Sequence, residues 1–196
     1  MKKNSIILIS LAAVLILLVM WGISGYNSLI TLREDVNSQW ANVESQYQRR
    51  SDLIPNLVST VKGYATHESS TLEGVVAARA KATQITIDPK NLTPQKLQEY
   101  QAAQGQVSSA LGKLLMITEN YPDLKANQNF LELQAQLEGT ENRISVERSR
   151  YNETAKSYDV SIKFFPRSVI AMLGGFTEKP YFESEKGAEN APAVKF

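Results

Sequence analysis

The chain has 196 residues, a formal net charge of +1 and no cysteine. A near-neutral chain has no surplus of basic side chains to neutralise phosphates, so the composition argues against nucleic-acid binding. The lack of cysteine excludes disulfides, a lipidated cysteine and thiolate metal sites. Long stretches dominated by Gln, Ala, Glu, Leu and Ser favour helix over strand, so we predict an all-α fold.

An uncharged apolar run covers residues 6–23 and follows Lys2 and Lys3. A helix rises about 1.5 Å per residue, so the run would span roughly 27 Å, close to the apolar thickness of a bilayer. We predict a transmembrane helix over residues 6–25, a short N-terminus over residues 1–5, and hence a single-pass protein of the cell membrane. A cleavable signal peptide is the alternative, but its apolar region usually has only about 7–15 residues.

The charges that flank this run predict its orientation. Lys2 and Lys3 precede it, whereas the first charged residue beyond it is Arg33. Because positively charged flanks stay in the cytoplasm, we predict a cytoplasmic N-terminus and an extracytoplasmic body. The opposite orientation is kept as the alternative, because two lysines alone decide the matter.

A heptad seam of mostly apolar residues extends over residues 29–64 and predicts a long helix there, of the coiled-coil type. Pro55 lies inside this helix and removes one backbone donor. We therefore expect a kink over Asp52–Pro55.

A second helix is expected after a polar stretch. Ser70 and Glu73 have the spacing of a capping box, which predicts a helix from Ser70 to about Thr83. The pattern leaves open whether residues 27–83 form one kinked helix or two.

The rest of the chain predicts further helices. Residues 84–93 form the clearest loop, and Thr93–Pro94 is a typical start for a helix, which would end near residue 120. The last long helix is expected to begin near Asp123 and to be stopped by Pro166. Two long helices with shorter ones between them predict an antiparallel bundle.

This bundle is predicted to extend over residues 26–182, with its last helix returning toward the membrane. The return would bring the apolar segment Val169–Phe176 close to the bilayer. Contact with lipid or with a partner is one interpretation of this segment, and packing under the bundle is the favoured one. Residues 183–196 are polar, with Ala and Pro, and are predicted to be disordered.

Catalytic chemistry finds little support in the sequence. His67 is the only histidine, and no His-Glu-x-x-His motif, nucleophile elbow or phosphate loop is present. A general-base role for His67 is conceivable, but a polar residue at a helix break is the favoured interpretation. We predict no enzyme, no cofactor and no metal.

Arginines interrupt the apolar seams. Arg50 lies in the first seam and Arg148 in the last one. A buried cation must be paired, and we expect Arg50 to pair with Asp52, or with Glu138 or Glu141 of the last helix. Such charges would bind an acidic ligand or partner, or form an internal ion pair that fixes helix register. The internal pair is the favoured hypothesis.

Arg79 lies near the end of the second predicted helix, where a cation interacts favourably with the helix C-terminus. No catalytic, cofactor-binding or metal-binding residue is predicted. The candidate structural or partner-binding positions are Arg50, Asp52, Arg79, Glu141 and Arg148.

Blocks spread over residues 26–182 resemble the LemA family of bacterial membrane proteins. Three of them are RRSDLIPNLV at residues 49–58, YPDLKA at residues 121–126 and EGTENRI at residues 138–144. The resemblance implies an N-terminal transmembrane helix and a bundle of long helices, and it carries over no catalytic residue. The family has also been described with its short N-terminus outside, which supports the alternative orientation.

The leading hypothesis is a membrane-anchored, non-enzymatic helical scaffold or partner-binding protein of the bacterial cell envelope. Its expected partners are the lipid bilayer and proteins of unknown identity, with self-association as a further option and no nucleic acid. The alternative is an accessory subunit of a membrane protease or transporter that uses the C-terminal apolar segment.

Overall fold

The computed structural model describes residues 2–183, and side chains from residue 6 onward. This part of the chain is all-α, as predicted, and contains no strand. Its elements are α1 (Lys2–Lys62), α2 (Ser69–Gln84), η1 (Pro89–Asn91, a short 3₁₀ turn), α3 (Pro94–Thr118), α4 (Pro122–Lys125), α5 (Gln128–Lys163) and α6 (Arg167–Leu173).

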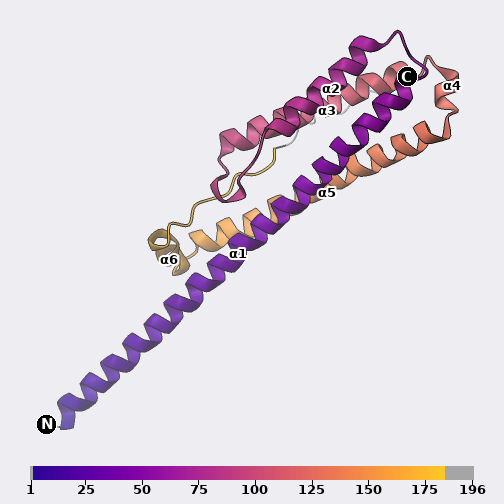
Figure 1. The fold of residues 1–196 in the computed structure, drawn as a ribbon. Helices are drawn as coiled ribbons and strands as arrows, with labels where there is room; N and C mark the ends of the chain where they lie inside the picture. Colours follow the sequence, from indigo (N-terminus) through magenta and orange to yellow (C-terminus); the bar gives the residue numbers. More distant parts are fainter. Residues whose placement is uncertain (1, 184–196) are drawn as a thin grey trace, which may run out of the picture.

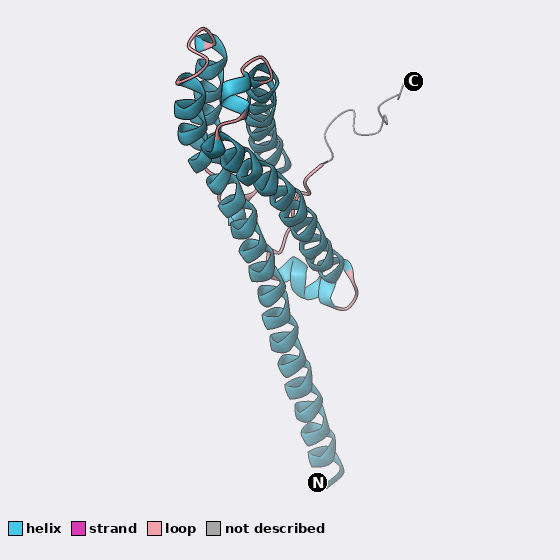
Figure 2. Cartoon of the chain, turned by 90° about the vertical axis from the view of Figure 1, so that its right-hand side faces the viewer, coloured by secondary structure: helices cyan, strands magenta, loops and turns pink. Residues whose placement is uncertain are grey.

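The helices form an elongated bundle from which the N-terminal part of α1 projects alone (Figures 1 and 2). α5 runs antiparallel along α1, and the hairpin of α2 and α3 lies beside this pair (Figure 1). The connection between α3 and α5, which contains α4, lies at the end of the bundle farthest from the N-terminus. The predicted antiparallel bundle is therefore present.

One continuous helix, α1, joins the apolar run to the first bundle helix. It has 61 residues and contains Pro55 without ending there. Residues 27–83 belong to two helices, because α1 ends at Lys62 and α2 begins at Ser69. The predicted capping box is not used, since Glu68 occupies the N-cap of α2 and makes no capping hydrogen bond with its side chain.

The caps of the later helices follow local chemistry. Thr93 caps α3 by accepting a hydrogen bond from the backbone N–H of Lys96, with Pro94 at the first helical position, as predicted. We expected the last long helix to begin near Asp123, but this prediction is wrong, because α5 begins at Gln128. A separate short helix, α4, contains Asp123, and Asn127 caps α5 by accepting from the N–H of Phe130 at 3.0 Å.

The apolar run stands clear of the bundle. The described part of α1 from Ile6 onward contains a segment long and apolar enough to cross a membrane, and none of that segment is buried inside the protein. Trp21 and Tyr26 are 46% and 43% exposed near its bundle-proximal end. Large apolar side chains left uncovered in this way are typical of a segment that contacts a membrane or another protein.

Two clusters of buried side chains form the core. The cluster nearer the apolar run is centred on Trp40, whose ring contacts Tyr100, Tyr151 and Phe182 at centroid distances of 5.5–5.7 Å. The cluster at the far end joins α1 to α2, α3, α4 and α5. The buried apolar side chains that α1 contributes are those of Leu29, Val36, Trp40, Val43, Tyr47, Ile54, Leu57 and Val61, which confirms most of the predicted seam.

An extended strap, residues 177–183, lies along α5 after α6. Side chains of α5 hold its backbone, because Asn152 both accepts from the N–H of Phe182 (2.8 Å) and donates to its carbonyl (2.9 Å). The hydroxyl groups of Tyr158 and Tyr151 donate to the carbonyls of Thr177 and Pro180. Glu183, which we placed in the tail, instead belongs to this strap, and the remaining predicted tail, residues 184–196, lies outside the described residues.

Candidate functional site

Arg50 occupies the point on α1 where the two core clusters meet. Its position follows from the heptad seam, which places it between the buried side chains of Tyr47 and Ile54. The residue is only 1% exposed. A guanidinium removed from water in this way needs compensation for its charge and for all of its donors.

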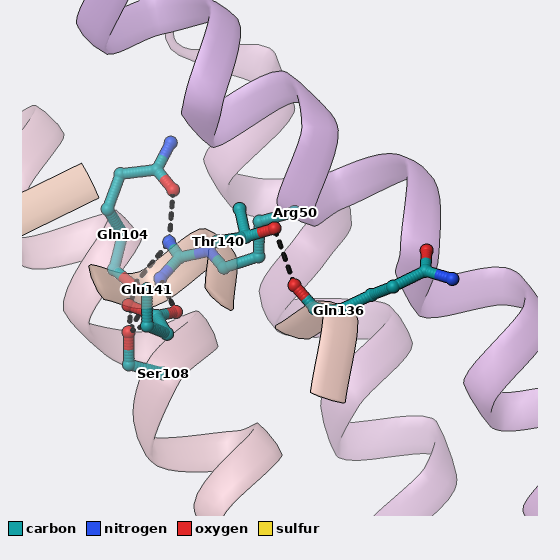
Figure 3. A network of polar contacts seen from close by, with 6 residues as sticks. All are labelled: Arg50, Gln104, Ser108, Gln136, Thr140 and Glu141. Carbon is teal, nitrogen blue, oxygen red and sulfur yellow. Dashed lines mark hydrogen bonds and ion pairs between the residues drawn. The ribbon is translucent and has the colours of Figure 1, made fainter. Parts of the chain in front are cut away.

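The guanidinium of Arg50 joins three helices (Figure 3). One terminal nitrogen, Nη1, donates to Glu141 Oε1 on α5 at 2.5 Å and to Ser108 Oγ on α3 at 2.7 Å. The other, Nη2, donates to the side-chain oxygen and the backbone carbonyl of Gln104, at 2.6 and 3.1 Å. The guanidinium also lies 5.2 Å from the ring centroid of Tyr47, a cation–π distance.

Of the three acidic partners expected for Arg50, the structure places Glu141 against it. Asp52 is exposed and accepts a hydrogen bond from Gln48 on the same helix. Glu138 accepts one from Gln134, also on its own helix. The side chain of Glu141 is 41% exposed, so water reaches the anion but not the cation of this pair.

Arg148 lies on the same face of α5 as Glu141 and binds the strap instead of an acidic group. Its Nη2 donates to the carbonyl of Glu183 at 2.7 Å, and its guanidinium lies 5.1 Å from the ring centroid of Phe182. Arg50, Glu141, Arg148 and the end of the strap line one open groove. The structure thus brings three of the five candidate residues together.

Arg79 makes a contact that the sequence pattern did not predict. Its Nε donates to the carbonyl of Ser51 on α1 at 2.8 Å. In an α-helix that carbonyl would accept from the N–H four residues on, but that residue is Pro55, which has none. Arg79 therefore satisfies the backbone acceptor that the proline leaves free.

We expect Arg79→Ala to destabilise the protein by about 1–3 kcal/mol, the cost of leaving a buried carbonyl without a partner. In a Pro55→Ala background the same change is expected to cost less, because the alanine N–H can bond to Ser51. A double-mutant cycle measured by urea unfolding of the detergent-solubilised chain gives the coupling. Equal costs in both backgrounds would contradict the pairing of Arg79 with the proline gap.

A small cavity of about 120 Å³ lies beside this site, between α1, α2 and α3. Arg50, Arg79, Ser51 and Tyr100 are among its lining residues. Burial, more than the neighbouring Tyr47 and Glu44, raises the pKa of the Tyr100 hydroxyl. The phenol therefore stays protonated at neutral pH. The lining carries both signs of charge, because Glu44 lies there with the two arginines, and the cavity is too small for most organic ligands.

His67 is exposed in the connection between α1 and α2. Among the residues whose side chains are described, no group of three or more His, Asp or Glu side chains is arranged to hold a metal ion.

Several residues of the polar interior had no assigned role in the sequence. Gln104 occupies a seam position of α3, so its contact with a buried arginine could have been suspected from the heptad pattern. Asp159 is 3% exposed and accepts hydrogen bonds from the N–H of Lys179 and the hydroxyl of Tyr181. Burial and this contact with Asp159 raise the pKa of Tyr181 to about 12.

The fold and this interior define a class: a helical bundle carried on one long helix whose N-terminal part is apolar, with its helices tied together by buried arginine contacts. The chain belongs to the LemA family, whose model matches residues 39–196. The expected family resemblance is thereby confirmed.

Relatives of the chain carry two kinds of name. It is 29% identical to magnetosome protein MamQ of Magnetospirillum gryphiswaldense and 28% identical to magnetosome protein MamQ 1 of Paramagnetospirillum magneticum, in each case over 86% of this chain and 68% of the relative. It is 25% identical to protein LemA of Metamycoplasma hominis, over 74% of this chain and 63% of that relative. Together with the apolar part of α1, these relatives indicate a membrane-associated helical protein.

Proposed function

We propose that the chain is a non-enzymatic scaffold of the bacterial cell envelope, anchored in the membrane by residues 6–25 and binding other proteins through its helical bundle. The observation that carries the proposal is the continuity of α1. One 61-residue helix includes both the exposed apolar run and the central helix of the bundle. Such a helix holds the bundle at a fixed distance from the bilayer, which is a useful property in a scaffold.

The polar interior supports this proposal more than it supports catalysis. Arg50 is committed to Glu141, Gln104 and Ser108, and Arg79 to the carbonyl of Ser51. Groups engaged in this way hold helices together and are not free to bind a substrate. The likeness to relatives named as magnetosome proteins adds support for a membrane-associated role.

The test is photo-crosslinking in intact cells from three exposed apolar positions on different helices: Val76 on α2, Met116 on α3 and Val146 on α5. We expect adducts mainly at one of the three positions, which would identify the binding helix. They should contain a defined protein or a second copy of the chain, and the same partner should co-purify with the unmodified protein. No adduct at any position, together with a monomer in detergent, would contradict the scaffold.

We further propose that the bundle lies outside the cytoplasm, on the basis of Lys2 and Lys3. A cysteine at Met116 can be treated with a membrane-impermeant maleimide in cells whose outer barrier has been opened. Labelling without lysis supports an extracytoplasmic bundle. Labelling only after lysis supports the opposite orientation.

A further inference from the structure

The turn between α5 and α6 exposes an unusual amount of apolar surface. Outside the apolar run, five large hydrophobic residues of the described chain are more than 60% exposed, and four of them belong to this hairpin. These four residues, called here the apolar foot, are Phe164 (66%), Phe165 (84%), Met172 (74%) and Leu173 (81%). Four large, exposed apolar side chains in one short hairpin are typical of an interaction surface.

The other face of the hairpin packs firmly on α1. Ala171 and Phe176 are buried, and Phe176 meets the ring of Tyr26 edge-on at 5.5 Å. Ile170 lies directly over Gly25, where an added Cβ would come within 2.5 Å of its Cδ1 atom. The favoured packing interpretation of Val169–Phe176 thus describes one face of the segment and leaves the foot uncovered.

The contact with Gly25 fixes the height of the foot along α1. Gly25 lies two residues beyond the end of the apolar run, which corresponds to about 3 Å along the helix. The headgroup layer on each side of a bilayer is roughly 5–7 Å thick. Figure 2 shows α6 beside α1, at the end of the bundle nearest the projecting N-terminal part. A bilayer around residues 6–23 would therefore place α6 at the level of its headgroups.

The charges of this segment suit a phospholipid surface. Residues 160–177 contain Lys163 and Arg167 and no acidic residue. Lys163 is paired with Glu178 at 2.9 Å, whereas the described contact of Arg167 is a hydrogen bond from Nη1 to Ser161 Oγ. Arg167 thus brings a positive charge to the foot without an acidic partner in the described contacts, as in interfacial segments that bind anionic lipids.

We propose that the apolar foot inserts into the headgroup region of the same bilayer that anchors α1, with a preference for anionic phospholipid. The inference rests on the proposed membrane anchor and adds a second, separate contact with the membrane. The span and the foot would then support the bundle at two points. Arg167 would lie among lipid phosphates, while the aromatic and aliphatic side chains reach the outer ends of the acyl chains.

The test uses the absence of cysteine in the chain, which allows an environment-sensitive dye to be attached at a single introduced cysteine. Met172→Cys probes the foot, and Met116→Cys is the matched control, because Met116 is 70% exposed and lies at the far end of the bundle. Val14→Cys reports on the anchor itself. Each full-length variant is reconstituted into vesicles of phosphatidylcholine and phosphatidylglycerol, with or without a lipid that carries a nitroxide near its headgroup.

We expect the nitroxide lipid to quench the dye at position 172 at least about twofold more than the dye at position 116, with a blue-shifted emission at position 172. Replacing all phosphatidylglycerol by phosphatidylcholine, or introducing Arg167→Gln, should reduce this quenching. If neither the lipid replacement nor Arg167→Gln changes the quenching at position 172, the preference for anionic lipid is wrong.

The outcomes separate failure of the foot from failure of the anchor. A shielded dye at position 14 with water-exposed dyes at both 172 and 116 would overturn the foot and leave the anchor intact. A water-exposed dye at position 14 would overturn the anchor. If position 172 is exposed in vesicles but protected from maleimide in native membranes, the foot binds a protein, as the accessory-subunit hypothesis requires, and the lipid proposal is wrong.

Discussion

Glu141→Ala is expected to lower the free energy of unfolding by about 3 kcal/mol. The change removes the anion from a guanidinium that is almost completely buried, and breaking a buried ion pair in this way typically costs about 3–5 kcal/mol. The lower end applies because Glu141 is partly exposed, and because Gln104 and Ser108 still accept from Arg50. Urea unfolding of the detergent-solubilised chain, followed by far-UV circular dichroism, measures the loss.

Two further variants test whether loss of the buried ion pair causes the destabilisation in Glu141→Ala. Glu138→Ala changes the same residue type about one turn away on α5, where the carboxylate contacts only Gln134 among the described hydrogen bonds. It is expected to cost less than about 0.5 kcal/mol. Arg50→Met combined with Glu141→Ala should be more stable than Glu141→Ala alone, because no buried charge remains. Equal costs for Glu141→Ala and Glu138→Ala would show that the buried pair does not govern stability.

Trp40→Ala is expected to cost about 3–5 kcal/mol, the usual range for removing a large aromatic side chain from a core. Trp40 is 1% exposed and stacks on Phe182 of the strap, with ring centroids 5.7 Å apart and planes inclined by only 5°. The change should therefore loosen the strap as well. In the folded protein the backbone N–H of Phe182 donates a hydrogen bond to the side-chain oxygen of Asn152. Hydrogen exchange at this N–H therefore reports the loosening directly.

A conservative replacement separates size from hydrogen bonding. The indole N–H of Trp40 has no acceptor among the described residues, so Trp40→Phe loses no hydrogen bond. We expect it to cost only about 1–2 kcal/mol, for the smaller ring and the residual cavity. Met116→Ala, at an exposed position, should change stability by less than about 0.5 kcal/mol. A similar loss for Phe and Ala at position 40 would argue against the packing account.

Most of the fold could be predicted from the helical periodicity of the apolar residues. The seam of α1, the Thr93 cap and the antiparallel return of α5 all depend on patterns that local sequence contains. The division between α4 and α5 was missed, although Asn127 is a typical N-cap residue, because the apolar spacing on either side suggested one helix. The strap was missed because its order depends on side chains of α5, not on any repeat of its own.

The candidate site was predictable in part. A charged residue on an apolar seam must be paired when it is buried. This rule predicted three possible acidic partners for Arg50, and Glu141 is one of them. The role of Arg79 could not be read in the same way. Pro55 predicts a carbonyl without a donor at Ser51, but which side chain satisfies it depends on how α2 packs against α1. Such pairings are properties of the tertiary arrangement.

The uninterrupted course of α1 also makes it a lever. With the proposed anchor in a bilayer and no joint at the membrane surface, the bundle would follow every tilt of the membrane-spanning segment. Transmembrane helices tilt by about 20° on average, and over the roughly 57 Å from Ser24 to Lys62 such a tilt displaces the far end sideways by about 20 Å. In the proposed arrangement, a change in bilayer thickness that alters the tilt would therefore move the tip formed by α4 and the ends of α1 and α3.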